Sequence, residues 1–175
     1  VFQNLLICAA RVEKVIRDPR IAAVTLTGSE KAGSEVAKIA GSEIKKAVLE
    51  LGGSDPFIVM EDADLELACE IGAASRISSN AGQACNAAKR FIVHEKVVVE
   101  FTKLMVEKFA KLKIGDPTDP ATQIGPVSSD QILKDVERQV NESVKKGAKI
   151  ELGGKRWGSK GYFYEPTVLA DVKPG

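Results

Sequence analysis

Strand-like and helix-like segments alternate along almost the whole chain, and this alternation restricts the possible folds more than any other feature. Helical segments of about 10 to 15 residues between strands are typical of βαβ units. The order therefore predicts an α/β fold with mainly parallel strand pairing. The expected strands are 22–27, 46–51, 57–60, 91–93 and 148–152. Helices are expected at 10–18, 29–40 and 98–112, of which the last is the clearest.

Capping residues give the expected starts of two further helices. Asp64 precedes a stretch with apolar residues at helical spacing, which makes it a candidate N-cap. The run Ser128-Ser129-Asp130-Gln131 is typical of a capping box and should open a long helix that ends at Gly147. Only two strands are expected before Gly52, fewer than the five or six of a complete doubly wound domain.

Composition excludes several classes of function. The 175 residues carry a formal net charge of +1, which gives no reason to expect a nucleic-acid partner. The apolar runs are too short to span a bilayer, and the first residues do not have the pattern of a signal peptide. The three cysteines are widely spaced and odd in number, so neither a disulfide framework nor a metal site is expected. This suits a reducing, cytoplasmic environment.

The first candidate site motif runs from Thr27 to Gly33. An expected strand leads through Gly28 into a helix that Ser29 can cap. The N–H groups and dipole of a helix N-terminus attract a phosphate, so the motif is a candidate cofactor site. A plain tight turn with Ser29 as the N-cap explains the same residues.

The second motif is Glu50-Leu51-Gly52-Gly53, at the end of the next expected strand. The two glycines let a ligand approach the backbone closely, so Glu50 could face a cleft. A solvated or ion-paired carboxylate is the simpler interpretation of the same residue.

The third motif runs from Asn80 to Asn86 and contains Cys85. A reactive thiol needs an accessible polar setting, and this small, glycine-containing loop provides one. The alternative is an inert thiol. Lys89 and Arg90 follow closely and are expected to be an ordinary solvated pair. Cys8 and Cys69 lie in apolar patterns and are expected to be core thiols, and the single histidine, His94, is expected at the surface of a strand-to-helix turn.

In their order, these motifs resemble the NAD(P)-dependent aldehyde dehydrogenase superfamily, whose members carry Thr-Gly-Ser, then Glu-Leu-Gly-Gly, then Gly-Gln-x-Cys. The matching residues here are Thr27-Gly28-Ser29, Glu50-Leu51-Gly52-Gly53 and Gly82-Gln83-Ala84-Cys85, with further likeness at Asp62-Ala63-Asp64 and Tyr164-Glu165-Pro166-Thr167. Within the family, residues 24–33 and 87–93 look like the succinate-semialdehyde dehydrogenase branch. Many members of that branch have a substrate-binding arginine directly before the loop asparagine, where this chain has Ser79; its nearest arginine is Arg76.

The resemblance implies roles for these residues. The Cys85 thiolate attacks the aldehyde, the Cys85 N–H binds the oxyanion, and Glu50 activates the water that hydrolyses the thioester. The cofactor is NAD or NADP. The residues implied to bind it are Thr27, Gly28, Ser29, Gly33, Leu51 and Gly52.

The family fold is a three-layer parallel-sheet α/β fold, and the chain is expected to be an interior fragment of it, incomplete at both ends. Residues 1–51 are expected to form the C-terminal part of the dinucleotide-binding domain, and residues 52–175 the N-terminal part of the catalytic thiol domain. The implied partner is a small aldehyde, with succinate semialdehyde as a candidate, and the full-length enzyme is expected to be a homo-oligomer. The isolated chain is expected to be weakly active or inactive. A non-catalytic product that acts as a structural or assembly partner is the alternative, and a weak thiol esterase is a third.

Overall fold

The computed structural model describes residues 2–77 and 80–173, and the chain divides into two compact units, Val1–Gly53 and Ser54–Gly175. Among the described residues, the strands form three two-stranded sheets, two parallel and one antiparallel. The mixture of helices with parallel strands confirms the predicted α/β class. No helix in the described part of the chain has both the length and the hydropathy that a membrane span requires.

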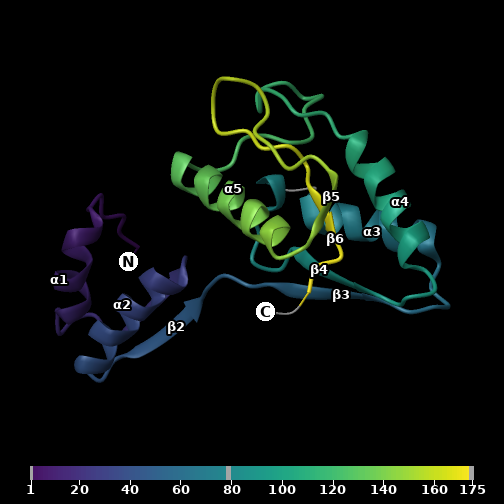
Figure 1. The fold of residues 1–175 in the computed structure, drawn as a ribbon. Coiled ribbons are helices and arrows are strands. Elements are labelled where there is room, and N and C mark those ends of the chain that lie inside the picture. The colour runs from purple at the N-terminus through teal and green to yellow at the C-terminus, as the bar shows by residue number, and fades with distance from the viewer. Residues whose placement is uncertain (1, 78–79, 174–175) are drawn as a thin grey trace. The chain divides into compact units, whose positions relative to one another are not determined.

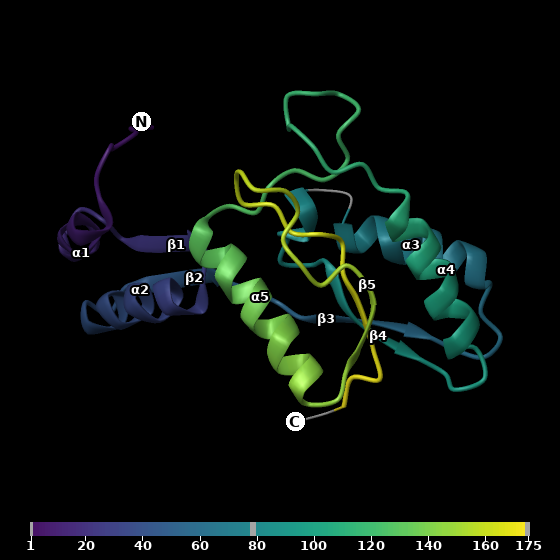
Figure 2. The ribbon, with the colours of Figure 1, turned by 45° about the horizontal axis from the view of Figure 1, so that its top comes forward.

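The first unit is built around one βαβ arrangement, whose α2 and β2 are labelled in Figure 1 and whose β1 is labelled in Figure 2. Strand β1 (Ala23–Thr27) pairs in parallel with β2 (Lys46–Glu50), and α2 (Glu30–Ser42) connects them. A short 3-10 turn, η1 (Ala9–Arg11), and α1 (Val12–Arg17) precede this arrangement. The core of the unit consists of Ile16, Val36 and Ala40 from the two helices, packed against Leu26 and Leu49 of the strands. Both predicted strands and both predicted helices are therefore present.

The second unit begins with another parallel pair. Strand β3 (Asp55–Val59) lies beside β4 (Ala88–Val93), connected through α3 (Leu65–Ile77) and a short turn, η2 (Asn80–Gly82). Helix α4 (Val98–Ala110) packs against α3, as Figure 1 shows. The largest core of the molecule lies between these helices and one face of the sheet, and its fully buried members are Val59, Cys69, Phe101, Met105 and Phe109.

The remainder of the second unit contains α5 (Asp130–Lys145), β5 (Lys149–Leu152) and β6 (Val168–Ala170). Figure 2 shows α5 beside the yellow segment that carries β6. Leu133 and Val140 of α5 pack on Tyr164 and Leu169 there. Strand β6 was not predicted, because its three residues are too few for an alternating pattern. Its antiparallel pairing with β5 also departs from the expectation of mainly parallel strands.

Helix α5 starts one residue later than the predicted capping box requires. Ser129, not Ser128, is the N-cap, and its hydroxyl accepts a hydrogen bond from the N–H of Ile132 at 3.3 Å. With Ser129 at this place the third helical residue is Ile132, so Gln131 cannot complete the box. The other two caps are as predicted: Ser29 accepts from the N–H of Ala32, and Asp64 from the N–H of Leu67.

Within the described residues of the second unit, no helix covers one face of the β3–β4 sheet. Phe57 and Phe91 face the core, whereas the register partners Ile58 and Ile92 face the other way and are 63% and 52% exposed. Met60, just after β3, is exposed as well. A parallel sheet is normally covered on both faces, so an apolar face of this kind is unusual for a monomer.

Candidate functional site

The predicted residues of the first unit gather at one edge of its sheet. Thr27 and Glu50 are the last residues of β1 and β2, and the parallel register places them directly opposite each other. Both are exposed. Ligands of open α/β sheets bind outside the carboxyl ends of the strands, which is the edge that these two residues occupy. Glu50 forms no ion pair in the described part of the chain, so the ion-paired interpretation of this carboxylate does not apply.

The turn from β1 into α2 is closed by main-chain and side-chain hydrogen bonds. The Gly28 N–H donates to the Glu50 carbonyl oxygen at 3.0 Å, which joins the two strand ends. Ser29 caps α2, and its carbonyl accepts from the Gly33 N–H at 2.9 Å. The N–H groups of Glu30 and Lys31, in the first helical turn, have no acceptor inside the helix, and neither donates to another group within residues 2–77 and 80–173, so both can bind an anion.

The other three candidates of this unit have different surroundings. Gly33 is buried, and a Cβ at this position would lie 2.6 Å from Leu51 Cδ2. This glycine therefore allows the Leu51 side chain to pack on the helix. Gly52 is exposed, and the Glu30 carboxylate lies beside it: a Cβ there would be 3.2 Å from Glu30 Oε1.

Cys85 lies in the second unit, in a turn between η2 and β4, and its side chain is exposed. Its loop has an unusual backbone. Asn80, Ala81 and Gly82 follow one another with φ of 53°, 52° and 76°, in the left-handed region. A non-glycine residue with φ in this region destabilises the folded state by roughly 1–3 kcal/mol. Such a conformation persists only where contacts with the surrounding structure hold it in place.

The side chains of Arg76 and Gln83 hold the backbone of this loop in place. The Arg76 guanidinium, at the end of α3, donates to the Gly82 carbonyl oxygen at 2.9 Å, and burial lowers the pKa of Arg76. The Gln83 Nε2 donates to the Asn80 carbonyl at 2.8 Å, and the Gln83 Oε1 accepts from the Ser128 N–H at 2.8 Å. Gln83 thus ties the thiol loop to the segment before α5. Arg76 contacts the loop backbone, and Ser79, the position at which the resemblance led us to look for an arginine, lies outside the described residues.

Lys89 and Arg90 are not the solvated pair that we expected. The half-buried Lys89 ammonium donates to the carbonyl oxygens of Ala84 at 2.8 Å and Cys85 at 2.9 Å. Arg90 Nε donates to the Ser54 carbonyl at 2.9 Å. Both cations therefore donate to main-chain carbonyl oxygens. The two carbonyls that Lys89 contacts lie directly before and after the Cα of Cys85.

The remaining thiols and the histidine lie apart from this loop. Cys69 is fully buried, as predicted, and burial raises the pKa of its thiol to about 11. Cys8 is exposed, so the prediction of a core thiol is wrong: the apolar run around it lies on the surface of the first unit. His94 follows β4 in the turn before α4, where its Nδ1 accepts from the Lys96 N–H at 3.3 Å. No cluster of three metal-ligating side chains occurs within residues 2–77 and 80–173.

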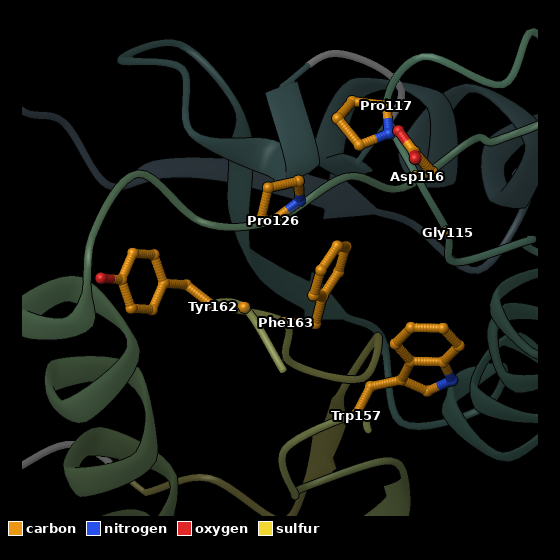
Figure 3. Close-up of a pocket in the computed structure, with 8 residues that line it drawn as sticks. Gly115, Asp116, Pro117, Pro126, Trp157, Tyr162 and Phe163 are labelled. Carbon is orange, nitrogen blue, oxygen red and sulfur yellow. The ribbon is translucent and has the colours of Figure 1, made fainter. Parts of the chain in front are cut away.

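An open aromatic cavity of about 440 Å³ lies elsewhere in the second unit (Figure 3). The rings of Trp157 and Phe163 meet edge to face there, with centroids 5.4 Å apart. Gln83 Nε2 lies 3.5 Å from the carbonyl oxygen of Pro126, which lines this cavity. None of the predicted site residues lines it.

The sequence patterns identified candidate site residues but did not identify the side chains whose hydrogen bonds hold the Cys85 loop. Within the first unit, Thr27, Gly28 and Glu50 come together at the sheet edge. Lys89 and Gln83 were not predicted to be functional residues. Only the spacing of Lys89, four residues after the thiol on the following strand, could have suggested a contact with the loop.

Comparisons with known proteins agree on one family. Succinate-semialdehyde dehydrogenase (NADP(+)) of Mycobacterium avium is 52% identical over 171 residues, which are 98% of this chain and 36% of that protein. Among solved structures, succinic semialdehyde dehydrogenase from Streptococcus pyogenes in complex with NADP+ has a TM-score of 0.92 at 41% identity, and covers 97% of this chain and 37% of its own. Lactaldehyde dehydrogenase from Escherichia coli has a TM-score of 0.88 at 39% identity, over 93% of this chain and 34% of its own. The chain thus spans little more than a third of the length of these relatives. The model of the aldehyde dehydrogenase family matches residues 4–175, and the chain therefore belongs to this family.

Proposed function

We propose that this chain contributes the nucleophile and the general base of an enzyme that oxidises an aldehyde to a carboxylic acid, with Cys85 and Glu50 in these two roles. The observation that carries the proposal is the state of Cys85. Its thiol is exposed, and the loop that carries it has left-handed residues held by hydrogen bonds from Arg76 and Gln83. The Cys85 N–H donates to no group in the described part of the chain. A nucleophile and an oxyanion donor are therefore both available at one residue.

The proposed reaction begins with attack of the Cys85 thiolate on the aldehyde carbon. The C–S bond forms, the π electrons move to the carbonyl oxygen, and the Cys85 N–H stabilises the resulting oxyanion. The C=O bond then re-forms as a hydride leaves the same carbon, which gives a thioester on Cys85; the nicotinamide cofactor, when bound, would supply the acceptor for this hydride. Water attacks the thioester while Glu50 takes the water proton, and the C–S bond breaks, which releases the acid and restores the Cys85 thiolate.

The residues of the first unit fit a dinucleotide cofactor. Thr27, Gly28 and Ser29 are exposed at the carboxyl edge of the sheet, beside the unpartnered N–H groups of the first turn of α2. The pyrophosphate of the cofactor would lie against Gly28, Ser29 and these N–H groups, and Thr27 and Leu51 would flank the nicotinamide end. Since the matched relatives are named for NADP(+), we propose NADP as the cofactor, with NAD as the alternative.

Succinate semialdehyde is the substrate that we propose, because several of the similar proteins are named for it. This substrate carries a distal carboxylate, which a cation would recognise. Arg76 is already engaged with the Gly82 carbonyl, so the group that recognises the carboxylate is to be sought among other residues.

The test compares two exposed thiols. The full chain is incubated with succinate semialdehyde and NADP, or with p-nitrophenyl acetate, and adducts are located by peptide mass mapping. We expect a thioester on Cys85 in the wild type and in Cys8→Ala, and none in Cys85→Ala. NADPH formation or ester hydrolysis that survives in Cys85→Ala would contradict the proposal, as would a wild-type chain without any adduct on Cys85.

The bare face of the β3–β4 sheet supports a second function, that of an assembly partner. Ile58, Met60 and Ile92 form an exposed apolar surface on this face. Such a surface drives association with another copy or with a longer relative. The two functions are compatible, because Cys85 does not belong to this surface.

A further inference from the structure

Lys89 contacts the nucleophile's loop in a way that the proposed reaction has not used. Its ammonium donates at 2.8 Å to the Ala84 carbonyl oxygen and at 2.9 Å to the Cys85 carbonyl oxygen. Lys89 is the second residue of β4, so the strand fixes the base of its side chain. The same Ala84 carbonyl also accepts a longer hydrogen bond, at 3.3 Å, from the Ala87 N–H.

The Ala84 carbonyl and the Cys85 N–H belong to one peptide group. This group is planar and trans, so the carbonyl oxygen and the N–H point in opposite directions. An ammonium that holds the oxygen therefore fixes the direction of the N–H on the other side. The N–H fixed in this way donates to no group in the described part of the chain, and is the one that the proposed reaction uses for the oxyanion.

The charge of Lys89 has a second effect on the same peptide. A charged donor makes a stronger hydrogen bond than a neutral one. A strong bond at the carbonyl polarises the amide and makes its N–H a better donor. An oxyanion donor that is already oriented before the reaction costs no reorganisation when charge develops.

We infer that Lys89 is a positioning residue, which orients and polarises the Cys85 N–H as an oxyanion donor. The inference rests on the proposed role of Cys85 as the nucleophile. Lys89 touches neither the substrate nor the thiol in this role and acts only through the Ala84–Cys85 peptide. The earlier part of the loop is held separately, by Arg76 and Gln83.

The test separates acylation from alkylation at Cys85. When p-nitrophenyl acetate acylates the thiolate, the C–S bond forms, an oxyanion develops, and p-nitrophenolate leaves with its electron pair. Iodoacetamide alkylates the same thiolate by displacement of iodide at a saturated carbon, without an oxyanion. Lys89→Met should slow acylation on the order of tenfold or more, because a poorly oriented N–H stabilises the developing oxyanion less well. Alkylation should stay within about twofold of the wild-type rate, because no oxyanion develops in that reaction.

Two further variants complete the experiment. Lys89→Arg keeps a charged donor and should restore most of the acylation rate, whereas Lys103→Met removes an exposed lysine of α4 and should change neither rate. Equal slowing of both reactions in Lys89→Met would mean that Lys89 holds only the fold or the thiol, and would overturn the inference. Unchanged acylation would overturn it as well.

A second measurement does not depend on any reaction. In a chain labelled with 15N-cysteine, the three cysteine amides give separate NMR signals, and Cys85→Ala assigns one of them. Lys89→Met should shift the Cys85 amide signal alone, because the carbonyl of its peptide loses the charged donor, and Lys89→Arg should leave it near its original position. A Cys85 signal that does not move would overturn the inference. If Cys85 is not acylated even in the wild type while its amide signal shifts as expected, the proposed function fails and the orienting contact stands.

Discussion

At the scale of single residues, the three cysteines show how surroundings decide the chemistry of one side chain. Cys8 and Cys85 are exposed, and Cys69 is fully buried in the core between α3 and α4. The Cys69 thiol lies 3.6 Å from the Phe101 carbonyl oxygen. Loss of solvation disfavours the thiolate there and raises its pKa to about 11. Because the thiolate is the reactive form, a thiol-alkylating reagent should react more slowly with buried Cys69 than with exposed Cys8 and Cys85.

Alkylation with iodoacetamide at pH 8 should therefore modify Cys8 and Cys85 and spare Cys69. Peptide mass mapping measures each site, and unfolding in urea should make all three react. The raised pKa also has a consequence for stability. The contribution of the neutral Cys69 thiol is present below its ordinary pKa of 9.0 and is lost as the pH rises through about 11. Rapid modification of Cys69 in the folded chain at pH 8 would contradict its burial.

At the scale of elements, the start of α5 depends on which serine is the N-cap. Ser129 satisfies the Ile132 N–H with its hydroxyl, whereas Ser128 uses its main-chain N–H to donate to Gln83. The helix is strongly amphipathic, with Leu133 and Val140 buried on one face. The start of α5 therefore determines which residues of the helix are buried. It also places the N–H of Ser128 where Gln83 can accept its hydrogen bond.

Ser129→Ala should lower the free energy of unfolding of the second unit by about 1 kcal/mol, the usual cost of losing an N-cap hydroxyl. Ser128→Ala is the matched control and should change it by less than about 0.5 kcal/mol. Fluorescence of Trp157, the single tryptophan, follows the unfolding of this unit in urea. A larger loss for Ser128→Ala would favour the capping box that the sequence suggested.

At the scale of the whole molecule, the uncovered face of the β3–β4 sheet is the dominant feature. Ile58 and Ile92 lie opposite each other in the parallel register and expose apolar surface. A parallel sheet is normally covered on both faces. We therefore expect this chain to self-associate through this face.

The variant Ile58→Glu with Ile92→Lys should reduce this association and leave the fold intact, because opposite charges at paired positions are tolerated in a sheet. Sedimentation velocity measures the association at several concentrations. Val99→Glu is the control, since Val99 on α4 is 81% exposed but lies outside the sheet face. A wild-type chain that remains monomeric at all concentrations would contradict the prediction.

The sequence by itself determined the order of elements and the identity of the candidate groups. Local patterns suffice for this: β-branched runs, helical spacing and caps depend on neighbours in sequence, and β1, α2 and β2 are close to their predicted bounds. The ordered motifs also selected Cys85 and Glu50 as the candidate nucleophile and base. The three-residue strand β6 is too short to carry such a pattern.

Only the tertiary structure decided what surrounds these groups. The exposure of Cys8 and the hydrogen bond between Gln83 and Ser128 depend on contacts between segments that no local pattern encodes. A charged side chain near a loop is usually solvated, so the sequence favoured that interpretation for Lys89. The ammonium reaches the carbonyls beside Cys85 because the turn closed by the hydrogen bond from the Ala87 N–H to the Ala84 carbonyl brings the start of β4 close to them.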